Sequence, residues 1–278
     1  MDIKIVSDSS ADAINYKSNI PFESVPLKII TDEKEFVDDT NIDVKEMVDY
    51  LLTYKGKSST ACPSIMDFIS AFGDSKYVIC ITITGTLSGS YNAACIAKAE
   101  YEESHPGSKV CVINSLSAGP ELRLFIDKAS EYIESGMDFD TICNKLDEYT
   151  KNTGLVFSLN SLNNLARNGR VNPIIAKAVG LLGIRIVGKA SEKGDLQQLD
   201  KPRGADKAYK KVVERMISEG YKGGKAFIDH CFNSEGAQTV KKLILEQFIN
   251  AKITIQNTYG LCSFYAENGG MLIGFEKI

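Results

Sequence analysis

Short apolar runs alternate with amphipathic segments along the first half of the chain. Residues 77–83 and 109–113 are almost continuously apolar, which is typical of strands buried on both faces of a sheet. Segments between such runs carry apolar residues at the three- and four-residue spacing of a helix. The pattern predicts strands at 3–6, 25–30, 77–83 and 109–113, and helices at 43–54, 64–72, 91–102, 120–134 and 138–151. This alternation is typical of a mostly parallel sheet with helices on both faces, so we expect an N-terminal α/β domain over residues 1–153.

The second half of the chain has a different pattern. It predicts strands at 154–159, 184–189, 225–231, 252–259 and 271–276, and helices at 161–169, 172–182, 201–219 and 234–248. A turn sequence at 267–270 separates the last two predicted strands, and a turn between late strands favours antiparallel pairing. We therefore expect a C-terminal α+β domain over residues 154–278, with a largely antiparallel sheet, in a chain of the α/β fold class.

Composition and charge argue against several classes of partner. The 278 residues carry a net charge of −4 and no basic run, which argues against nucleic acid. The longest apolar runs are far shorter than the roughly 20 residues that span a bilayer, so we expect no integral membrane segment. The 7 cysteines form no Cys-x-x-Cys pair, and the 2 histidines lie outside zinc-ligand spacing. We expect no metal site, no cofactor, and reduced thiols in a cytoplasmic protein without a secretory signal.

Serine, threonine and glycine gather where the predicted parallel strands end. Residues 7–10, 84–90 and 114–119 each follow such a strand, and ligands of parallel sheets bind at the carboxyl ends of the strands. The 84–90 loop also opens a helix, so its N–H groups and hydroxyls suit an anionic group; a purely structural turn is the alternative. Residues 60–64 combine hydroxyls with a proline, which suits a helix start or hydrogen bonds to a carboxylate.

Two other functions stay open from these residues. The Ser88 loop invites a small-molecule hydrolase or transferase with a serine nucleophile, which requires a general base that only His105 or His230 can supply. Neither is an evident partner, because His105 stands in a charged loop and His230 lies at the end of a predicted strand, before a helix. The basic helix predicted at 201–219 suits either a regulatory protein-interaction module or a plain solvated face.

The motifs, taken together and in order, resemble those of the DegV family, which includes the FakB fatty-acid carriers of bacterial fatty-acid kinases. Residues 7–10 fit its Asp-Ser turn, 60–64 its Thr-Ser-Gln-Pro-Ser segment, and 87–91 its Leu-Ser-Gly-Thr-Tyr segment. Residues 162–171 fit Leu-x-x-Leu-x-x-Gly-Gly-Arg-Ile, and Arg203 with the next glycine fits a later Arg-Gly pattern. The resemblance runs nearly end to end.

The resemblance implies a non-catalytic carrier with a long-chain fatty acid buried between its two domains. Thr60 and Ser88 would hold the carboxylate by their hydroxyls and Gly89 by its backbone N–H. Arg203 would contribute to docking of the kinase or to the head group. The acyl tunnel would be lined by the apolar residues Ile174, Ile175, Val179 and Leu182.

One departure from the family pattern falls on the carboxylate site. The family often carries a histidine in Gly-x-His-x-Gly-Pro-Gly near the C-terminus, whereas this chain has none there, and Cys262 or Ser263 would take its place. Burial of an acyl chain is favourable by roughly 0.8 kcal/mol per methylene, but an unpaired buried carboxylate is costly. The head-group pocket therefore still requires hydroxyl and amide donors at one end.

Overall fold

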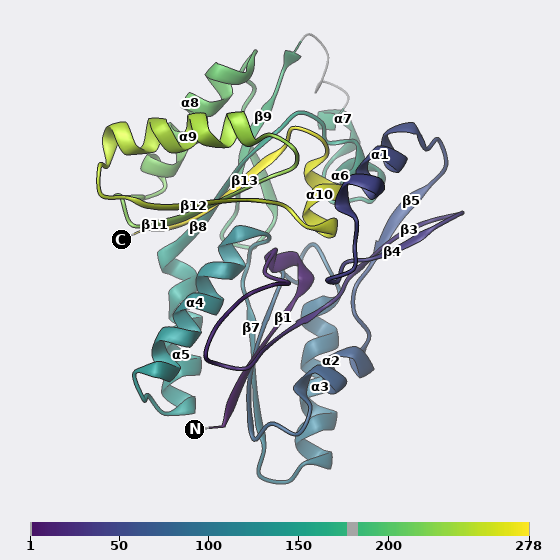
Figure 1. Cartoon of the computed structure of the whole chain (residues 1–278), viewed down its shortest axis with the longest axis vertical. Helices are drawn as coiled ribbons and strands as arrows, with labels where there is room; N and C mark the ends of the chain where they lie inside the picture. The colour runs from purple at the N-terminus through teal and green to yellow at the C-terminus, as the bar shows by residue number, and fades with distance from the viewer. Residues whose placement is uncertain (1, 177–182, 278) are drawn as a thin grey trace.

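The N-terminal half is built on a four-stranded parallel sheet. The structure is a computed structural model that describes residues 2–176 and 183–277 (Figure 1). The strand order is β2-β1-β6-β7, and every neighbouring pair is parallel. The strands are β1 (Ile3–Asp8), β2 (Phe22–Val25), β6 (Tyr77–Thr82) and β7 (Lys109–Asn114).

Alternating residues of these strands fill two separate cores. Ile79 and Ile81 of β6 pack with α4 (Pro120–Glu134) and α5 (Phe139–Tyr149) on one face. Val78 and Cys80 pack with α2 (Ile65–Phe72) and α3 (Ser90–Ser104) on the other. Because successive strand residues point to opposite faces, a continuous apolar run is what a sheet covered on both sides requires.

The C-terminal half is built on a six-stranded sheet in the order β10-β9-β8-β13-β11-β12. All neighbouring pairs are antiparallel except β11 and β12. Helices α8 (Ala205–Ser218) and α9 (Ser234–Gln247) cover one face. The strands are β8 (Thr153–Leu159), β9 (Ile186–Ala190), β10 (Leu196–Asp200), β11 (Lys225–His230), β12 (Lys252–Asn257) and β13 (Met271–Glu276). The predicted fold class is confirmed; the domain boundary between residues 153 and 154 stays a prediction, with β8 beginning at Thr153.

Helix α4 lies between the two large sheets (Figure 1). A side chain at Gly274 of β13 would come within 2.4 Å of the backbone nitrogen of Glu121, so the helix start rests directly on that strand. Arg123 of α4 forms a buried ion pair of 2.6 Å with Asp229 of β11. The two halves therefore share one helix as a common layer.

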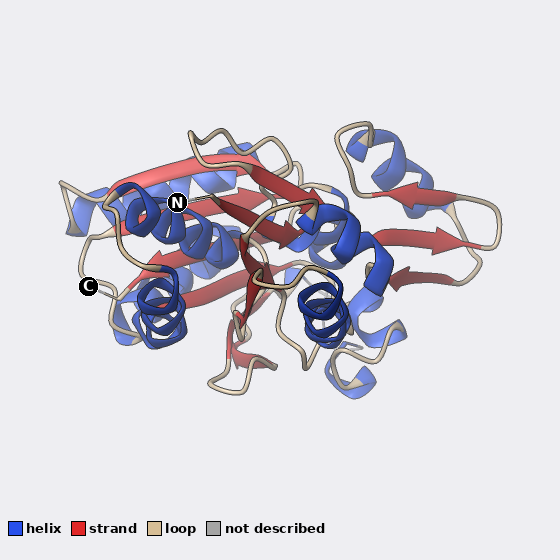
Figure 2. Cartoon of the chain, turned by 90° about the horizontal axis from the view of Figure 1, so that it is seen from below, coloured by secondary structure: helices blue, strands red, loops and turns tan. Residues whose placement is uncertain are grey.

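A third, small sheet departs from the sequence-based prediction. Its antiparallel strands are β4 (Glu35–Val37), β3 (Lys28–Thr31) and β5 (Ser58–Ala61), and they stand apart from the large sheets beside α1 (Val44–Thr53) (Figures 1 and 2). The single strand predicted at 25–30 is wrong, because the chain breaks at Pro26, which has no N–H for a strand ladder. Strand β5 lies between the helices predicted at 43–54 and 64–72, where the sequence pattern predicts no strand.

The predicted pairing of the last two strands is also wrong. Strand β12 is an edge strand parallel to β11, whereas β13 pairs with β11 and β8. Between them lies α10 (Gly260–Ala266), which sequence patterning did not indicate. Its first backbone N–H groups, at Gly260 and Leu261, donate to the buried carboxylate of Asp38 at 2.6 and 3.0 Å, so an acid from the small-sheet region holds the helix start.

The remaining helices are short. They are α6 (Asn163–Arg167) and α7 (Pro173–Ala176). Over residues 2–176 and 183–277, no helix is both long and apolar enough to cross a membrane, and no cluster of potential metal ligands occurs.

Candidate ligand-binding site

A cavity of about 310 Å³ lies between the two halves of the molecule. This volume falls in the range of small-molecule sites, roughly 300–1,000 Å³. Leu155, Phe157 and Leu159 alternate along β8, so all three face the same side of the sheet and form one wall. The rest of the lining is Leu27, Thr60, Ala61, Cys62, Ile83, Leu87, Ser88, Gly89, Ala118, Leu165, Arg170, Leu196, Leu261, Cys262, Tyr265, Ala266 and Leu272.

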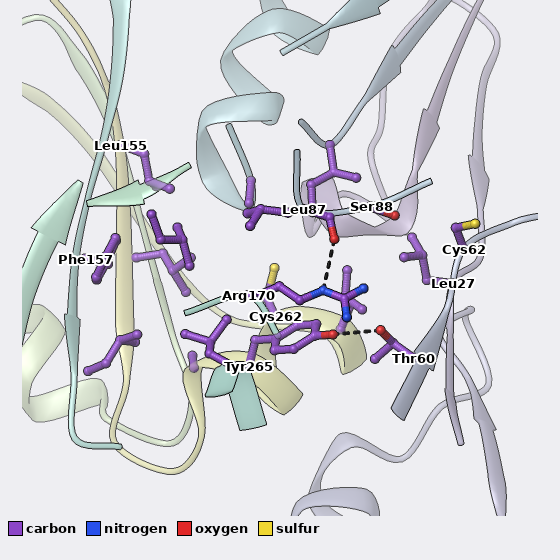
Figure 3. Close-up of a pocket in the computed structure, with 18 of the residues that line it drawn as sticks. Leu27, Thr60, Cys62, Leu87, Ser88, Leu155, Phe157, Arg170, Cys262 and Tyr265 are labelled. Carbon is purple, nitrogen blue, oxygen red and sulfur yellow. Dashed lines mark hydrogen bonds between the residues drawn. The ribbon is translucent and has the colours of Figure 1, made fainter. Parts of the chain in front are cut away.

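Polar groups gather at the end of the cavity away from the β8 wall (Figure 3). Thr60 of β5 and Tyr265 of α10 join hydroxyls across 2.8 Å, so the small sheet and the C-terminal half meet here. Burial raises the pKa of Tyr265, which keeps the phenol neutral and able to donate a hydrogen bond.

Arg170 is the cationic group of this polar end. Its Nε donates to the carbonyl oxygen of Leu87 at 3.1 Å, and its Nη1 donates to the carbonyl oxygen of Asn168. The bond to Leu87, dashed in Figure 3, and the bond to Asn168 together fix the guanidinium at the cavity. Within the described residues no carboxylate forms an ion pair with Arg170, so its charge is available to an anionic ligand.

Ser88 and Gly89 bring the start of α3 to the same end. The Ser88 hydroxyl lies 3.2 Å from that of Ser90 and accepts the Ser90 N–H. A side chain at Gly89 would lie 3.0 Å from the sulfur of Cys62, so the two segments approach closely here and a larger residue would have to displace the Cys62 side chain. The helix start adds backbone N–H groups and the positive end of a dipole to the polar end.

Family comparisons fit this arrangement. The family model of DegV, described as uncharacterised proteins, matches residues 2–277. A DegV domain-containing protein of Streptococcus pneumoniae is 41% identical over 279 residues, with 99% of each chain covered. The chain belongs to the DegV family.

Two solved structures of DegV proteins superpose closely on this one. The Streptococcus pneumoniae Fatty Acid Kinase (Fak) B3 protein loaded with linoleic acid is 41% identical, with a TM-score of 0.98 over 100% of both chains. A DegV family protein from Eubacterium eligens loaded with heptadecanoic acid is 40% identical, with a TM-score of 0.96 over 99% of this chain and 100% of the other.

Four of the five residues expected at the carboxylate line the cavity of this DegV protein: Thr60, Ser88, Gly89 and Cys262. Ser263 does not. It follows Cys262 on α10, and successive helix residues point about 100° apart. Its hydroxyl lies 2.6 Å from that of Thr258, in a separate polar cleft.

Cys262 stands where the family often carries a histidine, and it differs from one in charge. Its thiol donates to the carbonyl oxygen of Ser10 at 3.4 Å. Burial raises the pKa of the thiol well above its usual value, so Cys262 is a neutral wall of the cavity. Among the described lining residues, the cationic side chain is that of Arg170.

The other predicted site residues lie elsewhere or were not described. Arg203 is exposed and outside the cavity lining. Ile174 is 77% exposed on α7 and also outside the lining. The side chain of Ile175, and residues Val179 and Leu182, lie outside what the structure describes.

Sequence reasoning missed Arg170, Tyr265 and the β8 wall. Arg170 was within reach, because it is the arginine of the 162–171 motif and follows an apolar helix. Tyr265 gave no usable signal, since it reaches the cavity only through α10. The β8 wall gave no clear signal, because residues on both faces of that strand are buried.

The turn at 7–10 organises the interface between the halves and does not line the cavity. The hydroxyl of Ser9 accepts a hydrogen bond from the backbone N–H of Leu27 at 3.0 Å, and the carbonyl oxygen of Ser10 accepts one from the Cys262 thiol. Asp8 accepts the backbone N–H of Ile83 at 3.0 Å, which ties the ends of β1 and β6 together beneath the 84–90 loop.

The arrangement does not supply a base for a serine nucleophile. His105 follows the far end of α3, a helix of 15 residues and so about 22 Å long, and stacks on Tyr101. His230 accepts the backbone N–H of Asn233 and lines the separate polar cleft. Neither histidine is placed to take a proton from Ser88.

Proposed function

We propose that this DegV protein binds one long-chain fatty acid, with the carboxylate at Arg170 and the acyl chain running toward the β8 wall. The observation that carries the proposal is an apolar cavity whose described lining has a single fixed cation, at one end. That arrangement matches an amphiphile with one negative charge and a long apolar tail. The solved relatives loaded with linoleic and heptadecanoic acid support the same ligand class.

The energetics favour such a ligand. Each buried methylene contributes roughly 0.8 kcal/mol, so the apolar wall supplies affinity in proportion to chain length. The carboxylate gains charge-assisted hydrogen bonds from Arg170, and neutral donors at Thr60 and Tyr265 add to them. Both the acyl chain and the carboxylate of a fatty acid therefore find favourable contacts in the cavity.

The protein presents the carboxylate to a partner fatty-acid kinase and performs no catalysis itself. A surface cleft shares Leu87, Ser88, Gly89 and Arg170 with the cavity, so the polar end is the end that adjoins the surface there. The kinase assignment is supported by the name of the Streptococcus pneumoniae relative. We propose that the exposed Arg203 takes part in docking of the kinase. We also propose that the protein is located in the cytoplasm.

Native mass spectrometry of the purified protein, followed by organic extraction, tests the binding. We expect one acid per chain, released on denaturation and identified in the extract. Protein that carries no acid and takes up none when long-chain acids are added would contradict the proposal. Transfer to a kinase is a separate measurement, of acyl phosphate formed from the loaded protein, ATP and a FakB-dependent kinase.

A further inference from the structure

Phe157 is the middle residue of the β8 wall, and its ring lies in a conformation that depends on a glycine of the next strand. Phe157 of β8 pairs directly with Gly188 of β9, so the two positions face the same side of the sheet. A side chain at Gly188 would lie 2.4 Å from Cζ of the Phe157 ring and 2.6 Å from Cε2. The tip of the ring therefore rests on the Gly188 backbone.

No space for a side chain remains above Gly188. The same added side chain would also lie 2.6 Å from the backbone carbonyl oxygen of Gln197. Any larger residue at 188 would drive the ring away from β9, and glycine lets it lie down on the sheet. Phe157 is 3% exposed and lies on the opposite side of the cavity from Thr60 and Cys62 (Figure 3).

We propose that Phe157, seated on Gly188, is the residue that sets the longest acyl chain this protein accommodates. The inference rests on the proposed function and adds a specificity determinant to it. A chain whose carboxylate is held at Arg170 runs toward the β8 wall and meets the ring there. Removing the ring would add the space that it fills to the cavity, which would then extend to the Gly188 backbone.

The expected signature is a break in affinity along a series of acids. Each additional buried methylene tightens binding about fourfold, until the tail reaches the ring and further carbons add nothing. We would measure displacement of a fluorescent fatty acid by saturated acids from about 12 to about 22 carbons, where affinity scales with methylenes buried. The break in the wild-type series marks the chain length at which the tail reaches Phe157.

Phe157→Ala and the milder Phe157→Leu should move the break to longer chains, and the alanine variant by at least one two-carbon step. Val156→Ala is the matched control, since Val156 is the neighbouring residue on β8 but packs on the α8 and α9 face. It should leave the break in place. A break that stays in place in a folded leucine variant would overturn the inference alone, and wild-type protein that binds no acid would overturn the proposed function with it.

Phe157→Trp gives an independent readout, because the chain has no tryptophan. The larger ring should move the break to shorter chains. Its fluorescence should be quenched by an acid brominated near the terminal methyl and much less by one brominated near the carboxylate. Equal quenching by both acids, or stronger quenching from the carboxylate end, would contradict a tail that ends at Phe157.

Discussion

Arg170 is the charged side chain among the described residues that line the cavity. Two backbone carbonyls, of Leu87 and Asn168, hold its guanidinium, so little side-chain entropy is lost when a ligand arrives. Thr60, Ser88 and Tyr265 are neutral and can orient a carboxylate but cannot balance its charge. Affinity for an acid over an alcohol of the same length therefore depends on this arginine.

Replacing Arg170 by leucine should weaken fatty-acid binding about 10- to 100-fold, because a hydrogen bond to a charged group contributes roughly 1.5–3 kcal/mol. Affinity for the matching fatty alcohol should change much less. Displacement titrations with both ligands measure the difference. Arg167→Leu, at an exposed position of α6 outside the lining, is the control. Equal losses for acid and alcohol would refute a charge-based role for Arg170.

Among single residues, the sequence predicted the hydroxyl-bearing residues of the cavity better than its charged residue. Thr60 and Ser88 stand in recognisable Ser/Thr/Gly segments at strand ends, and both reach the cavity. Arg203, expected at kinase docking or at the head group, stays a prediction, whereas the arginine that lines the cavity among the described residues is Arg170. An arginine's target depends on where its long side chain is fixed, and here backbone carbonyls of two distant segments fix it.

Helix α10 is the element that connects the small sheet to the cavity. Leu261, Cys262 and Tyr265 line the cavity from this seven-residue helix. A helix so short is marginal alone and depends on tertiary contacts. The carboxylate of Asp38 supplies them by accepting two N–H groups of its first turn.

Asp38→Asn should lower the free energy of unfolding by about 1–2 kcal/mol, since an amide oxygen cannot replace both carboxylate acceptors. It should also weaken fatty-acid binding, because α10 forms part of the cavity. Urea denaturation and displacement titration measure the two effects. Asp39→Asn is the neighbouring control, because the carboxylate of Asp39 accepts its hydrogen bonds from Asn41 in its own loop. An Asp38 variant as stable as the control would contradict this account of α10.

Elements with a clear periodicity were predictable and elements defined by distant contacts were not. Helix α4 begins and ends where its apolar spacing indicates, and β6 and β7 follow their apolar runs. Strand β5 and helix α10 were missed, because their formation depends on partners far along the chain, β3 and Asp38.

Across the whole molecule, buried acids concentrate where the two halves meet. Burial raises the pKa of Asp8, Asp38 and Asp229 each to about 6, and that of Glu121 to about 7. Partial compensation comes from Ser10 for Asp8 and from Arg123 for Asp229. A short-range network of this kind rigidifies the interface that encloses the cavity.

These raised pKa values make stability fall as pH rises. Between the ordinary carboxyl pKa and the raised one, the folded state binds more protons than the unfolded state, so the free energy of unfolding decreases with pH. For Glu121 the decrease spans about pH 4.5 to 7. Glu121→Gln should therefore lose less stability than the wild type between pH 5 and 8, by on the order of 1–3 kcal/mol. Urea titrations at both pH values measure this, and identical pH dependence in the two proteins would be evidence against a buried, raised Glu121.

Carbon NMR of the protein loaded with a fatty acid labelled with ¹³C at its carboxyl carbon reports on where the bound carboxylate lies. Paired with Arg170 inside the cavity, the bound acid should give one resonance, distinct from free acid, that does not titrate between about pH 5 and 8, since a nearby cation lowers a carboxyl pKa. In Arg170→Leu that resonance should titrate within this range. A bound resonance that titrates like the free acid in the wild type, or one indifferent to the substitution, would place the carboxylate elsewhere and contradict the account.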